Sequence, residues 1–187
     1  MGNNLHIIRA LLGACLSTGC VCAQPVMRHD ASEVGKTIFF EDNRSFRHSA
    51  PMPASVFDAL LATEQAVYAR DQRAQNQKWG PKEFFRSAVV HLSGTDEADY
   101  VVNGLFPLAG IGCAWFWIVL PERGHARVVL FDSTGYLRIL ESKSNGYRDI
   151  ETVFTSAAGF SDHHIFQFDG HEYKLARDFE TAENQSQ

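Results

Sequence analysis

The sequence predicts an α+β fold in which one N-terminal amphipathic helix packs on a meandering antiparallel sheet of about six to eight strands. Three observations lead to this prediction. Apolar residues recur at helical spacing between Val56 and Tyr68. Beyond Phe84, short aromatic and β-branched runs alternate with turn residues. The intervals between these runs are too short for the crossover helices that a parallel sheet requires.

The expected helix follows Pro51-Met52-Pro53 and turns one apolar face inward. Pro53 suits a first helical turn, and Ser55 and Asp58 have the spacing of a capping box. Trp79-Gly80-Pro81 stops any helix at that point, because proline cannot continue it. The apolar positions that share one helical face are Val56, Phe57, Leu60, Leu61, Val67 and Tyr68.

Segments of strand composition follow the helix, and turn residues separate them. Aromatic and β-branched residues dominate these segments, as is typical of strands. They are Phe84–Leu92, Asp99–Asn103, Gly112–Leu120, Ala126–Phe131, Tyr136–Glu141, Ile150–Thr155, His164–Phe168 and Glu172–Leu175.

Two dipeptides, Asn145-Gly146 and Asp169-Gly170, are the strongest hairpin signals in the chain. Asp149 and Asp169 are expected to accept hydrogen bonds from backbone N–H groups just ahead of them and so to specify the fold of their turns. A further turn is predicted at residues 132–135, where aspartate, serine, threonine and glycine follow one another.

The composition is that of an ordinary globular domain. The 187 residues are 45% hydrophobic and 21% charged, which excludes disordered, collagen-like and coiled-coil classes. A formal net charge of −5 without a basic block argues against nucleic acid as a partner. We expect a single α+β domain at residues 51–178, an extended or partly ordered segment at 24–50 before it, and a frayed tail at 179–187.

Residues 1–23 have the pattern of a secretory signal peptide. A positive n-region precedes an apolar stretch too short to span a bilayer, and Val21 and Ala23 are the small residues that a cleavage site needs. A competing interpretation is a bacterial lipobox at Leu16–Cys20, in which Cys20 is lipidated. The first predicts a periplasmic or secreted protein. The second predicts a lipoprotein that touches the membrane through its anchor at Cys20.

Cleavage after Ala23 leaves Cys113 as the one cysteine of the mature chain, so no intrachain disulfide is expected. A lone cysteine is a candidate nucleophile when a histidine activates its thiol. The alternative is a small buried side chain in a core strand. The strand composition around Cys113 favours this alternative.

Trp115 and Trp117 are expected to share one face of a strand, because side chains alternate in direction along it. On a solvent-facing surface, two indoles bind a sugar ring or anchor a partner protein. On a covered face, they form a core layer beneath the helix. His163 and His164 are strand neighbours that point to opposite faces, so they cannot easily share an ion. The sequence therefore predicts no metal site and no cofactor.

Three motifs carry a resemblance to other proteins. They are a Phe-Trp pair inside Cys113–Val119, the turn Asn145–Ile150, and the Phe-Asp-Gly-x-x-Tyr hairpin at Phe168–Tyr173. With them, the stretch Phe84–Leu175 resembles a loose group of uncharacterised bacterial exported proteins, either periplasmic or lipoproteins. The resemblance implies an exported protein with this strand and hairpin architecture. It implies no activity, and it transfers no functional residue.

The sequence thus predicts an exported, non-catalytic envelope protein that binds another protein or a glycan. This prediction rests on the leader, on the aromatic faces of an antiparallel sheet, and on a chain without a recognisable catalytic motif. The alternative is a Cys-dependent hydrolase that uses Cys113 with a histidine partner.

Overall fold

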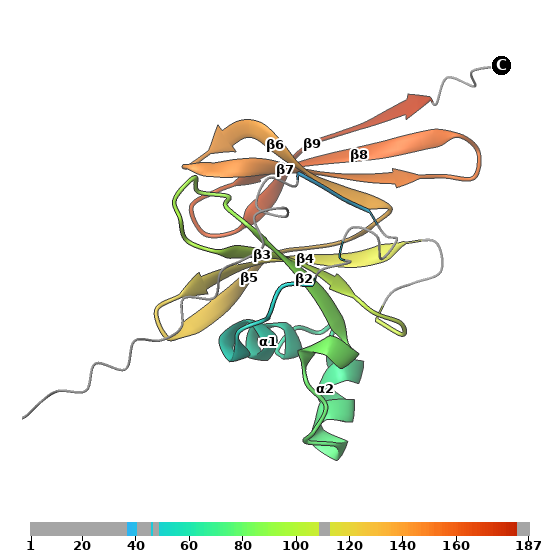
Figure 1. Ribbon diagram of the computed structural model, residues 1–187. Helices are drawn as coiled ribbons and strands as arrows, with labels where there is room; N and C mark the ends of the chain where they lie inside the picture. The colour runs from blue at the N-terminus through green and yellow to red at the C-terminus, as the bar shows by residue number, and fades with distance from the viewer. Residues whose placement is uncertain (1–36, 41–45, 47–48, 109–112, 183–187) are drawn as a thin grey trace, which may run out of the picture.

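The computed structural model describes residues 37–40, 46, 49–108 and 113–182 (Figure 1). Within them, two helices, α1 (Ala54–Leu61) and α2 (Val67–Gln75), and a short 3-10 turn at Pro81–Glu83 accompany nine strands. The strands are β1 (Ile38–Phe40), β2 (Phe85–Val90), β3 (Asp99–Gly104), β4 (Ala114–Glu122), β5 (His125–Thr134), β6 (Tyr136–Ser144), β7 (Tyr147–Thr155), β8 (Phe160–Phe168) and β9 (Tyr173–Ala182).

The described elements form three layers (Figure 1). The middle layer is a four-stranded sheet with the order β2-β3-β4-β5. The two helices lie on one side of it, and a five-stranded sheet with the order β1-β6-β7-β8-β9 covers the other side. All pairings are antiparallel. The antiparallel α+β prediction is confirmed, whereas the prediction of a single sheet with one helix is wrong.

The four-stranded sheet is buried on both faces, which explains why β4 is apolar at nearly every position. Phe116 and Ile118 pack in the core between the two sheets. Trp117 and Val119 pack in the second core, beneath the helices. The strands of this sheet therefore lack the alternation of polar and apolar residues that marks a half-exposed sheet.

The division into two sheets occurs at Gly135, where the sequence predicts a turn. The prediction is wrong because β5 continues through Thr134 and β6 begins at Tyr136, with only Gly135 between the two strands. The backbone N–H of Gly135 donates to the carbonyl of Val153 at 3.0 Å. A Cβ at Gly135 would lie 3.2 Å from the same oxygen, a tight contact that favours glycine at this position. One nearly continuous strand thus passes from one sheet into the other.

The helical region is divided, and β1 precedes it, so the predicted single N-terminal helix is wrong on both points. The Thr63 hydroxyl donates to the carbonyl of Leu60 at 2.7 Å, and such a bond competes with the helical backbone. Pro53 is the N-cap of α1 with no side-chain cap, so Ser55 and Asp58 form no capping box. The short α2 is polar, and only Ala69 within it is buried.

Strands also form in the segment predicted to be extended or partly ordered, residues 24–50, and in the predicted frayed tail, residues 179–187. β1 lies in the segment 24–50 and pairs with β6. β9 extends to Ala182 because it pairs with β8 along its whole length, so residues 179–182 are not a frayed tail. The predicted leader at 1–23, with its alternative lipidation site Cys20, lies outside the described residues. In the described part of the chain, neither helix is long and apolar enough to cross a membrane.

Candidate functional site

The structure brings the two tryptophans that the sequence proposes as a binding surface together beneath the helices. Trp117 is 0% exposed and packs against Phe85 and Phe131, with ring centroids 5.6 and 5.2 Å away. Trp115 is half-buried and lies edge-on to Trp117 at 6.2 Å. Both belong to the core layer beneath the helices. Trp117 is therefore inaccessible to a ligand in this fold.

Cys113 lies just before β4 and is half-buried. The hydroxyl of Ser133 donates to its Sγ at 3.1 Å. Among the described residues, no histidine is recorded in contact with this thiol. In the part of the chain that the structure describes, the polar contact of Cys113 is therefore the Ser133 hydroxyl of β5, which is not a base.

The predicted turn residues form tight hairpins. Asn145 and Gly146 both have positive φ, at 47° and 85°, as a two-residue hairpin turn requires. Asp169 Oδ1 accepts hydrogen bonds from the backbone N–H groups of His171 at 2.7 Å and Glu172 at 2.8 Å. These bonds hold the pKa of Asp169 below its usual value. Gly170 beside it has a φ of 100°.

Asp149 has a different environment from Asp169. Its carboxylate is buried and accepts a hydrogen bond from the Ser142 hydroxyl at 2.7 Å on the neighbouring strand. It therefore ties β6 to β7 and caps no turn.

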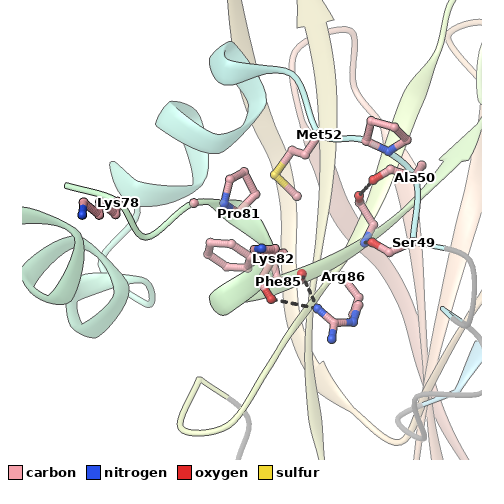
Figure 2. A pocket seen from close by; sticks show the side chains of 11 residues that line it. Ser49, Ala50, Met52, Lys78, Pro81, Lys82, Phe85 and Arg86 are labelled. Carbon is pink, nitrogen blue, oxygen red and sulfur yellow. Dashed lines mark hydrogen bonds between the residues drawn. The ribbon is translucent and has the colours of Figure 1, made fainter. Parts of the chain in front are cut away.

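A pocket of about 410 Å³ lies between the segment before α1, the loop after α2, and β2 (Figure 2). We call it the basic pocket. It is lined by Ser49, Ala50, Pro51, Met52, Lys78, Gly80, Pro81, Lys82, Phe85, Arg86 and Ser87. A volume of this size is typical of small-molecule sites.

The chain segment before α1 forms one wall of the basic pocket because it runs along the edge of β2. The backbone N–H of Ala50 donates to the carbonyl of Ser87 at 2.7 Å. In return, the Ser87 hydroxyl donates to the carbonyl of Ala50 at 2.8 Å, and the Ser87 N–H donates to the Ser49 hydroxyl at 3.0 Å. This ladder fixes the wall to the four-stranded sheet, so the pocket is preformed on a rigid element.

The opposite wall is the loop that carries Gly80. The Glu83 carboxylate accepts a hydrogen bond from the Gly80 N–H at 2.8 Å, which closes the short turn. Glu83 also lies 3.8 Å from the ammonium group of Lys82. Arg86 donates from Nη1 to the carbonyls of Lys82 and Phe85, at 2.9 and 3.4 Å (Figure 2). These bonds hold the guanidinium beside the turn.

A second cluster of polar side chains lies on the outer face of the five-stranded sheet. Glu151 of β7 is only 2% exposed, and its two oxygens pair with Arg138 of β6 and His163 of β8. His163 Nδ1 lies 2.9 Å from Glu151 Oε1, and its Nε2 lies 2.9 Å from the hydroxyl of Thr181. The ring of Phe179 stacks on His163 with the centroids 4.7 Å apart.

This cluster fixes the tautomer of His163. A carboxylate only accepts hydrogen bonds, so the proton of the neutral ring is on Nδ1, which faces Glu151. Nε2 is then the acceptor for the Thr181 hydroxyl. A hydroxyl, an imidazole and a buried carboxylate in line form the arrangement that activates a nucleophile.

His164 lies on the other face of the sheet, 3.8 Å from Asp132 of β5. The two neighbouring histidines therefore point apart and have separate partners. Within the described residues, no group of three or more histidine, cysteine and acidic side chains is placed to hold a metal ion.

Comparisons with protein-family models, with curated proteins and with solved structures find no match for this chain.

The sequence analysis identified neither the basic pocket nor the cluster around Glu151. Each site joins segments that are distant in the sequence, and no known motif links those segments. Glu151, His163 and Thr181 come from three strands, and only the strand register brings them together. For the basic pocket, a signal was available. Lys78, Lys82 and Arg86 recur every four residues around a glycine and proline turn.

Proposed function

We propose that this chain is an exported, non-catalytic binding module of the cell envelope and that the basic pocket is its ligand site. The observation that carries the proposal is the pocket itself, a hollow with apolar walls and converging polar groups on a fixed sheet edge. Export is proposed from the leader pattern of residues 1–23. Trp117 is buried in the core beneath the helices, which favours the basic pocket over the two tryptophans as the ligand site.

The wall residues give the pocket both shape and selectivity. Phe85 is buried in the core beneath the helices, and Met52 packs against the same cluster, so the apolar lining is part of the folded core. A ligand that fits this wall needs no large rearrangement of the protein, and preorganisation of this kind raises affinity.

A variant that fills the pocket tests the proposal. At Gly80 the φ is −111°, and a Cβ would meet only Glu83 Oε2 at 3.6 Å, so a side chain is tolerated there. A fragment library is screened by saturation-transfer NMR against the wild type and Gly80→Phe. We expect hits on the wild type that Gly80→Phe loses. Hits that bind both forms equally would place the ligand elsewhere and contradict the proposal.

A second candidate function, acyl transfer at Thr181, rests on the aligned Glu151, His163 and Thr181. The Thr181 hydroxyl would attack an ester carbonyl while its proton moves to His163 Nε2 and then to the departing alcohol. Water would then hydrolyse the acyl-threonine. We rank this function second because Thr181 lies on an exposed edge strand, whereas the basic pocket is concave.

The acyl-transfer function is tested with p-nitrophenyl acetate as the probe. The function predicts an acetyl group on Thr181, detected by peptide mass spectrometry, and loss of that group in His163→Gln. Equal nitrophenol release from the wild type and His163→Gln, with an unmodified Thr181, would exclude it.

A further inference from the structure

The charge of the basic pocket is opposite to that of the molecule. The chain has a formal net charge of −5, yet the pocket lining contains Lys78, Lys82 and Arg86 and no acidic side chain among the described residues. The carboxylate of Glu83, outside the lining, accepts the Gly80 N–H and lies 3.8 Å from the Lys82 ammonium group. A hollow lined by one sign of charge raises the local concentration of ligands of the other sign.

Arg86 is held in a position suited to an oxyanion. Both hydrogen bonds recorded for its guanidinium among the described residues use Nη1 (Figure 2). Within the described part of the chain, Nε and Nη2 donate to no other residue, so these two donors are open to a ligand. Two parallel N–H donors match the geometry of a carboxylate, a sulfonate or a phosphate. Fixing the fork in advance reduces the entropy lost when a ligand binds.

The other lining residues exclude an inorganic ion as the natural ligand. Ala50, Pro51, Met52, Pro81 and Phe85 present apolar surface next to the three cations. An inorganic anion fills neither that surface nor a volume of about 410 Å³. A ligand that uses the whole pocket has an anionic head and an apolar body.

We infer that the basic pocket binds a small organic anion that places its carboxylate, sulfonate or phosphate group between Lys82 and Arg86 and its apolar body against Met52 and Phe85. This inference rests on the proposed binding function and adds the class of ligand to it.

Two dyes with the same aromatic skeleton test the inference. Anilinonaphthalene sulfonate has the anionic group, and phenylnaphthylamine is the same molecule without it. Fluorescence titration of the full mature chain is expected to give at least about tenfold tighter binding of the sulfonate dye. Added salt is expected to weaken that binding, because screening acts on the charged contacts. Inorganic sulfate is expected to compete only weakly, since it lacks the apolar body.

Substitutions test whether the dye binds at the basic pocket and distinguish the loss of a charged contact from unfolding of the protein. Lys82→Gln and Arg86→Gln are each expected to weaken the sulfonate dye by about tenfold, and Arg86→Lys by less, because it keeps the charge but loses the fork. Arg123→Gln in the β4–β5 turn removes the same charge elsewhere and is expected to leave binding unchanged. Circular dichroism confirms that each variant is folded.

Three outcomes are distinguishable. Selective binding of the sulfonate dye that falls in Lys82→Gln and Arg86→Gln supports the inference. A second outcome is that the two dyes bind equally, that Gly80→Phe abolishes this binding, and that Lys82→Gln leaves it unchanged. This outcome would overturn the inference of an anionic ligand but would keep the pocket as the ligand site. Binding of neither dye to the folded wild type contradicts both the inference and the proposed function.

Discussion

Glu151 is an acidic residue that folding removes almost completely from water, although it lies on the outer face of a sheet. Its carboxylate is compensated by Arg138, whose side chain is 44% exposed, and by His163, which is 15% exposed. Burial of an ionised group is costly unless partners replace the lost water. The three residues therefore form one electrostatic unit that holds β6, β7 and β8 together on this face.

Loss of the Glu151 charge tests that unit. Glu151→Gln removes the charged acceptor that Arg138 and His163 share, and we expect the free energy of unfolding to fall by about 1–3 kcal/mol. The matched control is Glu141→Gln, which removes an exposed carboxylate that also pairs with an arginine. We expect that control to cost less than about 0.5 kcal/mol. Urea unfolding measures both, and equal losses would show that burial of Glu151 adds nothing.

Asp99 titrates in an unusual range for a carboxyl group. Burial raises its pKa from 3.8 to about 6, against the opposing effects of the Leu92 N–H bond and the His91 ring. At a pH between these two values, the Asp99 carboxyl is therefore protonated in the folded state and ionised in the unfolded chain. Between pH 3.8 and about 6, the folded state binds more protons, so stability from this group falls as pH rises.

The pH dependence of unfolding tests the Asp99 assignment. In wild type, Asp99 is expected to remove roughly 3 kcal/mol of stability between acid and neutral pH. Asp99→Asn keeps an oxygen that can accept from Leu92 but lacks the titrating proton, so its curve is expected to lack this fall. Asp96→Asn, an exposed neighbour, serves as the control. Parallel wild-type and Asp99→Asn curves would contradict the raised pKa.

In the β6–β7 hairpin, the dipeptide Asn145-Gly146 is sufficient to specify the turn. Asn145 and Gly146 adopt positive φ, and the Asn145 amide donates to the carbonyl of Phe168 at 2.6 Å. The turn therefore sets the register of its own hairpin and also contacts β8. Its sequence signal was sufficient because the required backbone conformation is confined to a few residue types.

A glycine substitution measures the value of that turn. Gly146→Ala places a Cβ at a φ of 85° with nothing within 4 Å, so its cost is backbone strain without a clash. We expect a loss of about 1–2 kcal/mol in the free energy of unfolding. Gly80→Ala, at a φ of −111°, is the control, and we expect no loss there. A neutral Gly146→Ala would mean that the turn accommodates the side chain by changing conformation.

The helices, strands and turns that short stretches of sequence specify could be predicted from the sequence. The apolar face of α1, the eight strands from β2 to β9 and both glycine turns follow from periodicity and turn chemistry. The sequence did not predict the break between α1 and α2. At this break the Thr63 hydroxyl donates to the carbonyl of Leu60, and no sequence pattern marks that bond in advance. Apolar periodicity continues through Val67 and Tyr68, yet both side chains are exposed.

At the scale of the whole molecule, the prediction of one meander failed because sheet membership is not a local property. The strands after Gly135 pair with one another and with β1, and they cover the first sheet instead of extending it. This arrangement buries the apolar run of β4 on both sides. It also turns Trp117 from a candidate ligand anchor into a core residue, which the sequence alone left open.

The basic pocket forms where the segments on either side of the two helices meet the four-stranded sheet. Its walls come from residues 49–52 and 78–87, which are separated by both helices and meet at the edge of β2. The recurring basic residues Lys78, Lys82 and Arg86 mark only one of these segments in the sequence, and the fold brings the other segment to them. The central claim is that this junction binds ligand.

Amide NMR spectra of nitrogen-labelled protein during titration with anilinonaphthalene sulfonate test that claim most directly. We expect the chemical-shift changes to saturate with one ligand and to concentrate at the amides of Ala50, Gly80, Lys82, Arg86 and Ser87. Changes that concentrate instead around His163 and Thr181 on the outer sheet face, with the pocket amides unmoved, would contradict it.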